Sequence, residues 1–256
     1  MKYIYGPVYS WRLGMSLGID PVSTKDKTCN LDCVYCQLGK TGSLSFERKV
    51  YVEAQDIVKE IAGLPDMQID YLTFSGRGEP TLAKNLGEMI RRLRACRKEK
   101  IAVITNSVLM TDPGVRQDLA AADFVLAKLD ACDQETFLSV NHAMQDVSFD
   151  KIVQGIKIFQ KDFPGKLALQ IMFVEANKNC AEKIAKIARE IAADEVEINT
   201  PLRPCGVKPL SQEELAAIKK YFDGLPVKTV YERERKTVVP LDDQDTVKRH
   251  GNFLDS

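Results

Sequence analysis

Three cysteines lie close together near the start of the chain, at Cys29, Cys33 and Cys36. Their CxxxCxxC spacing places three thiolate ligands in one loop, and an aromatic residue, Tyr35, precedes the last of them. Electron-transfer iron–sulfur clusters and structural zinc sites normally have four protein ligands. No histidine and no fourth cysteine follows at the spacing of a zinc finger. The loop therefore predicts a cubic 4Fe–4S cluster with one iron open to a small molecule, which is the arrangement of a catalytic centre.

The elements that must position this loop show as apolar segments alternating with helical patterns. Six segments read as strands buried on both faces, at Ser16–Asp20, Asp70–Ser75, Ile101–Asn106, Asp123–Leu129, Leu167–Val174 and Glu195–Asn199. Helical patterns occur at Ala54–Ala62, Leu82–Lys98, Pro113–Ala121, Gln134–Val140, Phe149–Lys161, Ala181–Ala192 and Ser211–Phe222. This alternation predicts an α/β fold, a partial (β/α)6 TIM-like barrel with parallel strands. In such a fold the functional groups gather at the C-terminal strand ends, where the cysteine loop also lies.

Two further expectations concern the outer parts of the molecule. We expect a core domain over residues 1–225 and a C-terminal extension over residues 226–256 that packs on it, beginning with a strand-like segment at Val227. In the second helical pattern, Leu86, Leu93 and Cys96 recur at helical spacing, which predicts that Cys96 packs in the core.

The composition limits the function classes. There are 36 basic and 36 acidic residues, so no overall charge draws the chain to nucleic acid or to a membrane. The basic run at residues 91–100 is interpreted as a solvated helix face. No signal peptide and no membrane-spanning run is recognisable, and seven cysteines without an export signal favour a reducing cytoplasm.

A second element with chemical potential follows the second expected strand. Gly78, Glu79 and Pro80 form a kink there, because glycine allows close backbone approach and proline cannot continue a strand. Exposed backbone groups and the Glu79 carboxylate would suit a zwitterionic ligand. The alternative is an ordinary turn.

Together, a CxxxCxΦC loop (Φ, an aromatic residue) after the first strand and a Gly-Glu-Pro element after the second resemble the radical S-adenosylmethionine (SAM) superfamily. The resemblance implies that the three cysteines ligate the cluster, that its open iron binds S-adenosylmethionine, and that Tyr35 lies beside the adenine. It also implies that Gly78, Glu79 and Pro80 hold the methionyl amino group. The implied reaction is reductive cleavage to methionine and a 5′-deoxyadenosyl radical, which abstracts a substrate hydrogen. An external one-electron reductant of flavodoxin or ferredoxin type would supply the electron.

Segments at Gly6-Pro7-Val8, Arg12–Asp20 and Asn199–Pro204 resemble the wyosine-synthase-like branch of that superfamily. This makes a nucleoside in RNA the first predicted substrate. Archaeal wyosine synthases carry three upstream cysteines for a second cluster, whereas no cysteine precedes Cys29, so that particular reaction is not expected. The alternatives are a small metabolite or peptide substrate, or a non-catalytic iron–sulfur protein that carries electrons.

Polar residues at the later strand ends complete the predicted site. As further cofactor-binding candidates we take Asn106, Ser107, Lys128, Asp130, Asn177, Thr200 and Arg203. The alternatives are strand capping for the first two and an ion pair for Lys128 and Asp130, which share one face of an extended segment. Three more cysteines, Cys132, Cys180 and Cys205, each follow a strand end, and one hypothesis is that they bind a second cluster.

Overall fold

The computed structural model describes residues 1–232 and 236–251, and its main feature is one sheet of eight strands. The strand order is β1-β2-β5-β6-β7-β8-β9-β10. Neighbouring strands are parallel throughout this sheet, except that β1 and β2 form an antiparallel pair. The strands of this sheet are β1 Ile4–Ser10, β2 Gly14–Ile19, β5 Tyr71–Phe74, β6 Lys100–Thr105, β7 Phe124–Lys128, β8 Lys166–Met172, β9 Glu195–Asn199 and β10 Val227–Thr229.

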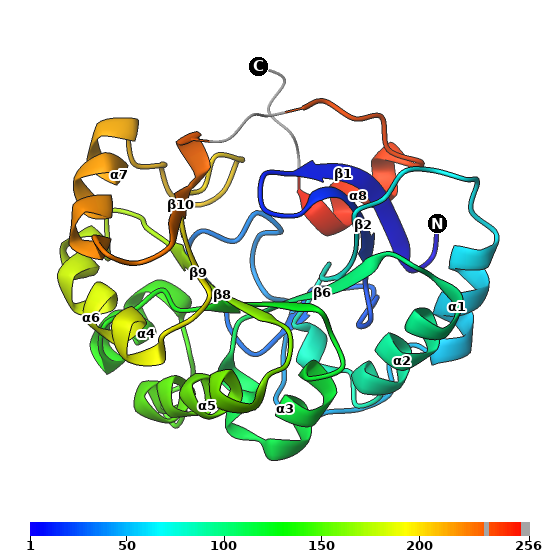
Figure 1. The fold of residues 1–256 in the computed structure, drawn as a ribbon, viewed down its shortest axis with the longest axis horizontal. Coiled ribbons are helices and arrows are strands. Elements are labelled where there is room, and N and C mark those ends of the chain that lie inside the picture. The colour runs from blue at the N-terminus through cyan, green and yellow to red at the C-terminus, as the bar shows by residue number, and fades with distance from the viewer. Residues whose placement is uncertain (233–235, 252–256) are drawn as a thin grey trace.

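The sheet curls into an open half-barrel with helices along its outer side (Figure 1). Two short strands, β3 Thr28–Cys29 and β4 Ser43–Leu44, form a separate pair. The helices are α1 Ala54–Ala62, α2 Leu86–Cys96, α3 Pro113–Leu119, α4 Gln134–Asn141, α5 Phe149–Asp162, α6 Ala181–Ile191, α7 Gln212–Lys219 and α8 Asp243–His250. Parallel strands linked by outer helices confirm the predicted partial TIM-like barrel.

Sequence reasoning missed one strand of the large sheet, β1, and the short pair of β3 and β4. The six predicted strands correspond to β2 and β5 to β9, and the strand-like segment at Val227 is β10. Strand β1 was not predicted, because Gly6 and Pro7 interrupt its pattern. The pairing of β1 with β2 shifts register between Tyr5 and Val8. Gly6 and Pro7 therefore lie within this irregularity, where a sheet tolerates them.

Alternation along the strands separates two apolar layers. Val196 and Ile198 of β9 point outward into the large core shared with the helices. The opposite face looks into the barrel, where Leu13, Phe124 and Leu126 form a smaller apolar cluster with neighbouring alanines. The barrel interior is therefore packed, and the space available for chemistry lies nearer the C-terminal strand ends.

The prediction for Cys96 was wrong. Its side chain is exposed at the last residue of α2, where the thiol reaches the carbonyl oxygen of Arg92 at 3.4 Å. At 3.6 residues per turn, Cys96 lies only about 20° around the helix from the buried Met89, so its exposure comes from its place at the end of the helix. The buried stripe therefore ends at Leu93.

The described part of the C-terminal segment packs on both edges of the half-barrel. Strand β10 pairs with β9, and α8 lies beside β1 (Figure 1). The backbone N–H of Leu241 donates to the carbonyl oxygen of Gly6 at 2.7 Å, and the Thr246 hydroxyl accepts from the Gly6 N–H at 3.0 Å. No helix among the described residues is both long and apolar enough to cross a bilayer.

Candidate functional site

The cysteine loop follows β2 and is tied to the Gly78–Pro80 segment through Thr28. Residues 28 and 78 form a parallel bridge, and the Glu79 N–H donates to the Thr28 carbonyl oxygen at 3.2 Å. A Cβ atom at position 78 would lie 1.9 Å from that oxygen, so only glycine allows this approach. The two motifs that sequence reasoning paired are therefore joined directly at their backbones.

Two amide side chains donate to sulfur atoms of the loop. Asn106 Nδ2 lies 3.6 Å from Cys29 Sγ, and Asn141 Nδ2 lies 3.3 Å from Cys33 Sγ. Burial raises the pKa of the Cys29 thiol to about 12 and that of Cys33 to about 11. Binding of a metal centre must therefore displace their protons.

The donor set of the loop suits an iron–sulfur cluster. All three cysteines are free thiols, and neutral amides rather than competing cations contact two of them. Among residues 1–232 and 236–251, no three cysteine, histidine or carboxylate side chains lie close enough together to hold a metal ion.

Glu79 braces the ends of β5 and β6. Its carboxylate is buried and accepts from the Thr105 hydroxyl at 2.6 Å, the Asn106 N–H at 2.8 Å and the Thr81 hydroxyl at 2.7 Å. Burial raises its pKa, while these hydrogen bonds oppose the rise. Glu79 thus fixes Asn106, which in turn contacts the cysteine loop.

Tyr35, Asp130 and Asn141 form a buried group beside Cys33, and the partly exposed Lys128 packs on it. The Tyr35 hydroxyl donates to Asp130, and the Lys128 ammonium lies 3.1 Å from Asp130 Oδ1 and 4.9 Å from the centre of the Tyr35 ring. Burial raises the pKa of Tyr35 well above its usual value. A small hollow lies among Asn106, Lys128, Asp130 and Asn141, closed on its other side by apolar residues of α4 and α5. These contacts join the cysteine loop to the ends of β6 and β7, as the predicted site requires.

The family model described as the radical SAM superfamily matches residues 27–188, which run from the cysteine loop into α6 and make up more than half of the chain. The chain belongs to the radical SAM superfamily. This identification confirms the resemblance based on the cysteine loop and the Gly-Glu-Pro element. Members of the superfamily use a 4Fe–4S cluster and S-adenosylmethionine as cofactors.

Three curated proteins are similar to this radical SAM protein in sequence. It is 38% identical over 211 residues to a UPF0026 protein of Synechocystis sp., covering 82% of this chain and 78% of that protein. A GTPase Obg of Brachyspira hyodysenteriae is 33% identical and matches 99% of this chain, which spans only 38% of that longer protein. A probable GTP 3′,8-cyclase of Saccharolobus islandicus is 25% identical, covering 80% of this chain and 65% of that protein.

Solved structures share the fold of this radical SAM protein. Streptococcus suis SuiB bound to the precursor peptide SuiA superimposes with a TM-score of 0.65 at 16% identity, covering 83% of this chain and 48% of that one. For archaeal TYW1 the TM-score is 0.59 at 16% identity, with 84% and 73% covered. For anSMEcpe with bound AdoMet it is 0.61 at 19% identity, with 84% and 64% covered. This chain thus spans about half to three quarters of these proteins, and the likeness concerns the fold.

Four of the predicted residues have their polar groups occupied by other parts of the chain. The Ser107 hydroxyl donates to the Lys128 carbonyl oxygen at 3.0 Å, and the Asn177 amide donates to the carbonyl oxygens of Asp130 and Met172 at 2.7 and 2.9 Å. The other two are Thr200, whose hydroxyl accepts from the Leu210 N–H at 2.9 Å, and Arg203, which contacts Gln37 and His250. Ser107 and Asn177 therefore support the predicted site from beneath, while Arg203 joins the cysteine loop to α8.

The three later cysteines are not brought together as a group. The thiols of Cys132 and Cys180 both reach the Thr136 hydroxyl, at 3.6 and 3.5 Å. Cys205 instead contacts the Val207 carbonyl oxygen at 3.2 Å and packs near Tyr35. The hypothesis of a second cluster thus finds two of its three ligands near one another.

A buried charged pair lies inside the barrel, at the level of Lys128 in the sheet register. Arg12, from the turn between β1 and β2, lies 3.5 Å from the fully buried carboxylate of Glu197. When the Gln170 amide is oriented with its oxygen toward Arg12, that oxygen accepts from the Arg12 guanidinium at 3.2 Å. Burial raises the pKa of Glu197 to about 7, and Arg12 opposes the rise.

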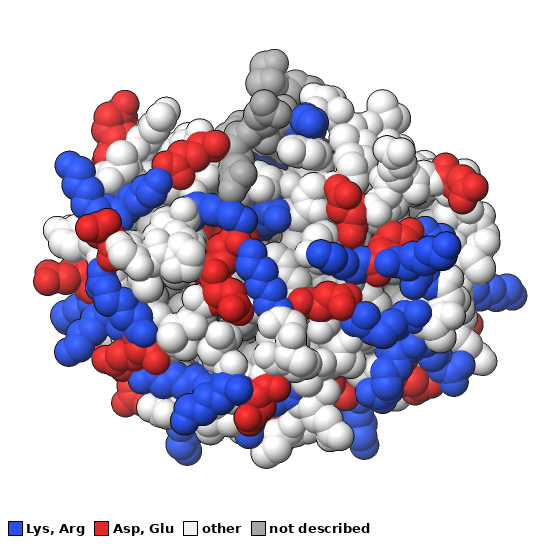
Figure 2. All heavy atoms as spheres, viewed as in Figure 1, with Lys and Arg blue, Asp and Glu red and all other residues white. Residues whose placement is uncertain are grey.

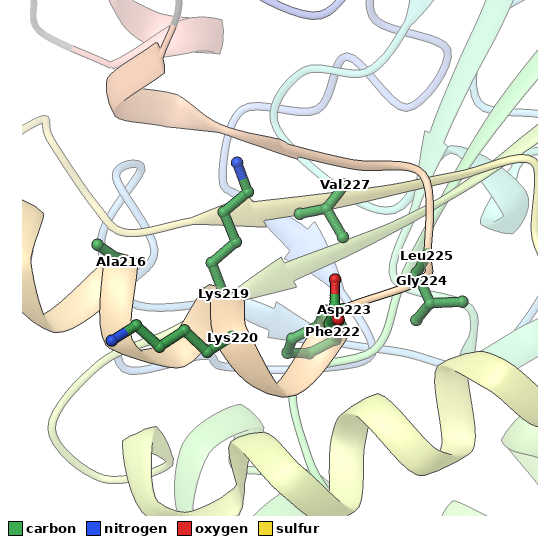
Figure 3. A pocket seen from close by; sticks show the side chains of 8 residues that line it. All are labelled: Ala216, Lys219, Lys220, Phe222, Asp223, Gly224, Leu225 and Val227. Carbon is green, nitrogen blue, oxygen red and sulfur yellow. The ribbon is translucent and has the colours of Figure 1, made fainter.

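A larger hollow lies away from this site. It is bounded by α7, the residues after it and β10, and its lining includes Lys219, Phe222 and Val227 (Figure 3). It opens at the N-terminal end of β10, opposite the strand ends that carry the cysteine loop. Because α/β folds bind their substrates at the C-terminal strand ends, we do not place the chemistry there.

Proposed function

We propose that this chain is a radical SAM enzyme in which Cys29, Cys33 and Cys36 hold the 4Fe–4S cluster. The observation that carries the proposal is the direct link, through Thr28, between the cysteine loop and the Gly78–Pro80 segment. When bound, the cluster and S-adenosylmethionine supply a radical that abstracts hydrogen from the substrate. An external one-electron reductant provides the electron.

The residues around the loop would position the cofactors and exclude water. Gly78 and Pro80 would present backbone groups to the methionyl amino group, while the Glu79 carboxylate holds the segment in place. Tyr35 and Lys128 would form one wall of the cofactor site, because they are stacked together and fixed by Asp130. Such prearranged polar groups orient a bound cofactor without reorganising during the reaction.

For the substrate we propose a nucleoside or nucleotide. Support comes from the resemblance to the wyosine-synthase-like branch and from the distant relative named as a probable GTP 3′,8-cyclase. Basic and acidic residues are interspersed over the face shown in Figure 2, which offers no continuous basic surface for a long RNA. A small nucleotide, or an RNA held by few contacts, is therefore favoured over extended RNA binding.

The test is anaerobic reconstitution followed by measurement of 5′-deoxyadenosine with dithionite as reductant. We expect release from the wild type and none from Cys29→Ala, Cys33→Ala or Cys36→Ala, with Cys96→Ala as the matched control. A well-loaded cluster that releases no 5′-deoxyadenosine would instead support a non-catalytic iron–sulfur protein. In a wild-type protein that does release 5′-deoxyadenosine, added GTP or transfer RNA should raise the rate of that release if either resembles the substrate.

A further inference from the structure

The amides of Asn106 and Asn141 are held in orientations that aim their N–H groups at sulfur. Asn106 Nδ2 also donates to Asn30 Oδ1 at 2.5 Å, and Asn106 Oδ1 accepts from the Val108 N–H at 3.1 Å. These contacts fix which end of the amide faces Cys29. The backbone N–H of Asn106, bound to Glu79, fixes the residue as a whole.

Asn141 is fixed even more firmly. Its Nδ2 faces Cys33 Sγ at 3.3 Å, the Tyr35 hydroxyl at 3.1 Å and Asp130 Oδ2 at 3.2 Å. A carboxylate can only accept, so the donor end of the amide must point this way. The residue is 3% exposed, and its backbone carbonyl oxygen accepts from the Asp32 N–H in the cysteine loop at 3.1 Å.

An N–H directed at a thiolate stabilises negative charge on the sulfur. A reduced cluster carries one more electron than the oxidised one, and that charge is shared with its thiolate ligands. Hydrogen bonds to the sulfurs therefore favour the reduced form and raise the reduction potential. Both cysteines are only partly exposed, so water screens this interaction less than it would at the surface.

We propose that Asn106 and Asn141 set the reduction potential of the cluster by donating hydrogen bonds to Cys29 and Cys33. The inference rests on the proposed function, since it needs the cluster in this loop. Both asparagines act as positioning residues, because their effect passes through the sulfurs. In the step concerned, one electron from the reductant enters the cluster, and no bond of the protein is made or broken.

The experiment is a redox titration of the reconstituted full chain, poised with dithionite and followed by electron paramagnetic resonance. Asn141→Leu and Asn106→Leu remove the donor while keeping the side chain's approximate size. Each should make one-electron reduction about tenfold less favourable, equivalent to a midpoint about 59 mV lower. Asn85→Leu is the matched control and should leave the midpoint unchanged, because Asn85 donates to the Val52 carbonyl oxygen at 3.0 Å, away from the loop.

Iron content is measured on every variant, and Asn141→Ala is included in case leucine overpacks its site. A midpoint that stays at the wild-type value in loaded Asn141→Ala and Asn106→Leu would overturn the inference. A wild-type chain that takes up no cluster would overturn both the inference and the proposed function. If the midpoint shifts but the protein never cleaves S-adenosylmethionine, the inference is supported and the proposed enzymatic activity is refuted.

Discussion

Replacing Gly78 with alanine should separate the two motifs of the site. The new methyl carbon would lie 1.9 Å from the Thr28 carbonyl oxygen, so the segments must move apart by about 1 Å or more to reach an allowed contact. That movement breaks the 3.2 Å hydrogen bond from the Glu79 N–H, which contributes about 1 kcal/mol. Overpacking adds about 1–2 kcal/mol. We therefore expect the unfolding free energy to fall by about 2–3 kcal/mol.

The same displacement should weaken cluster binding. Residue 28 adjoins Cys29, so a shift of about 1 Å misplaces one ligand of the cluster. We expect the cluster to bind about tenfold more weakly, which corresponds to a loss of about 1.4 kcal/mol in binding free energy. Iron per chain after anaerobic reconstitution and urea unfolding of the apoprotein measure the two effects. Gly63→Ala is the control, because the nearest atom to its new carbon is 3.6 Å away. Wild-type iron content together with unchanged stability in Gly78→Ala would refute the reasoning.

Three further predictions concern two buried ion pairs and the three later cysteines. The folded-state pKa of Glu197, about 7, exceeds its usual 4.5, so stability should fall by about 3 kcal/mol as pH rises between these values. Glu197→Gln should abolish that loss in urea unfolding at pH 5 and pH 8, and an unchanged slope would contradict the assignment. Arg249→Met should lower the free energy of unfolding by about 3 kcal/mol, because it leaves the buried carboxylate of Asp20 without its cation. Arg249→Lys keeps a cation and should lower it less. Equal thermal stability of the wild type and both variants would argue against this role. Iron content and 5′-deoxyadenosine release should survive simultaneous alanine substitution of the three later cysteines, Cys132, Cys180 and Cys205.

The barrel could be predicted from the sequence because its strands are buried on both faces. Such strands are continuous apolar runs, and the helical patterns between them leave few alternative topologies. Strand β1 escaped because its pattern is broken by Gly6 and Pro7. The prediction for Cys96 failed because helical periodicity does not show at which turn a buried stripe ends.

The neighbours of the cysteine loop show where sequence reasoning ends. Asn106 could be found, because it is the last residue of a predicted strand and lies at the same edge of the sheet as the cysteine loop. Asn141 could not, since it ends a short helix and meets Cys33 across 108 positions of sequence. The role of Glu79 as a brace was equally hidden, because its partners Thr105 and Asn106 come from the next strand.

The ion pair between Asp20 and Arg249 bears on the order of events during synthesis. Asp20 holds the N–H groups of Val22 and Ser23 at 3.2 and 2.9 Å, at the start of the stretch that leads to Cys29, and Arg249 Nε lies 3.3 Å from its carboxylate. The cation for this early residue is made only when translation has reached position 249. The stretch before the cysteine loop therefore cannot reach its final form until residue 249 has been synthesised.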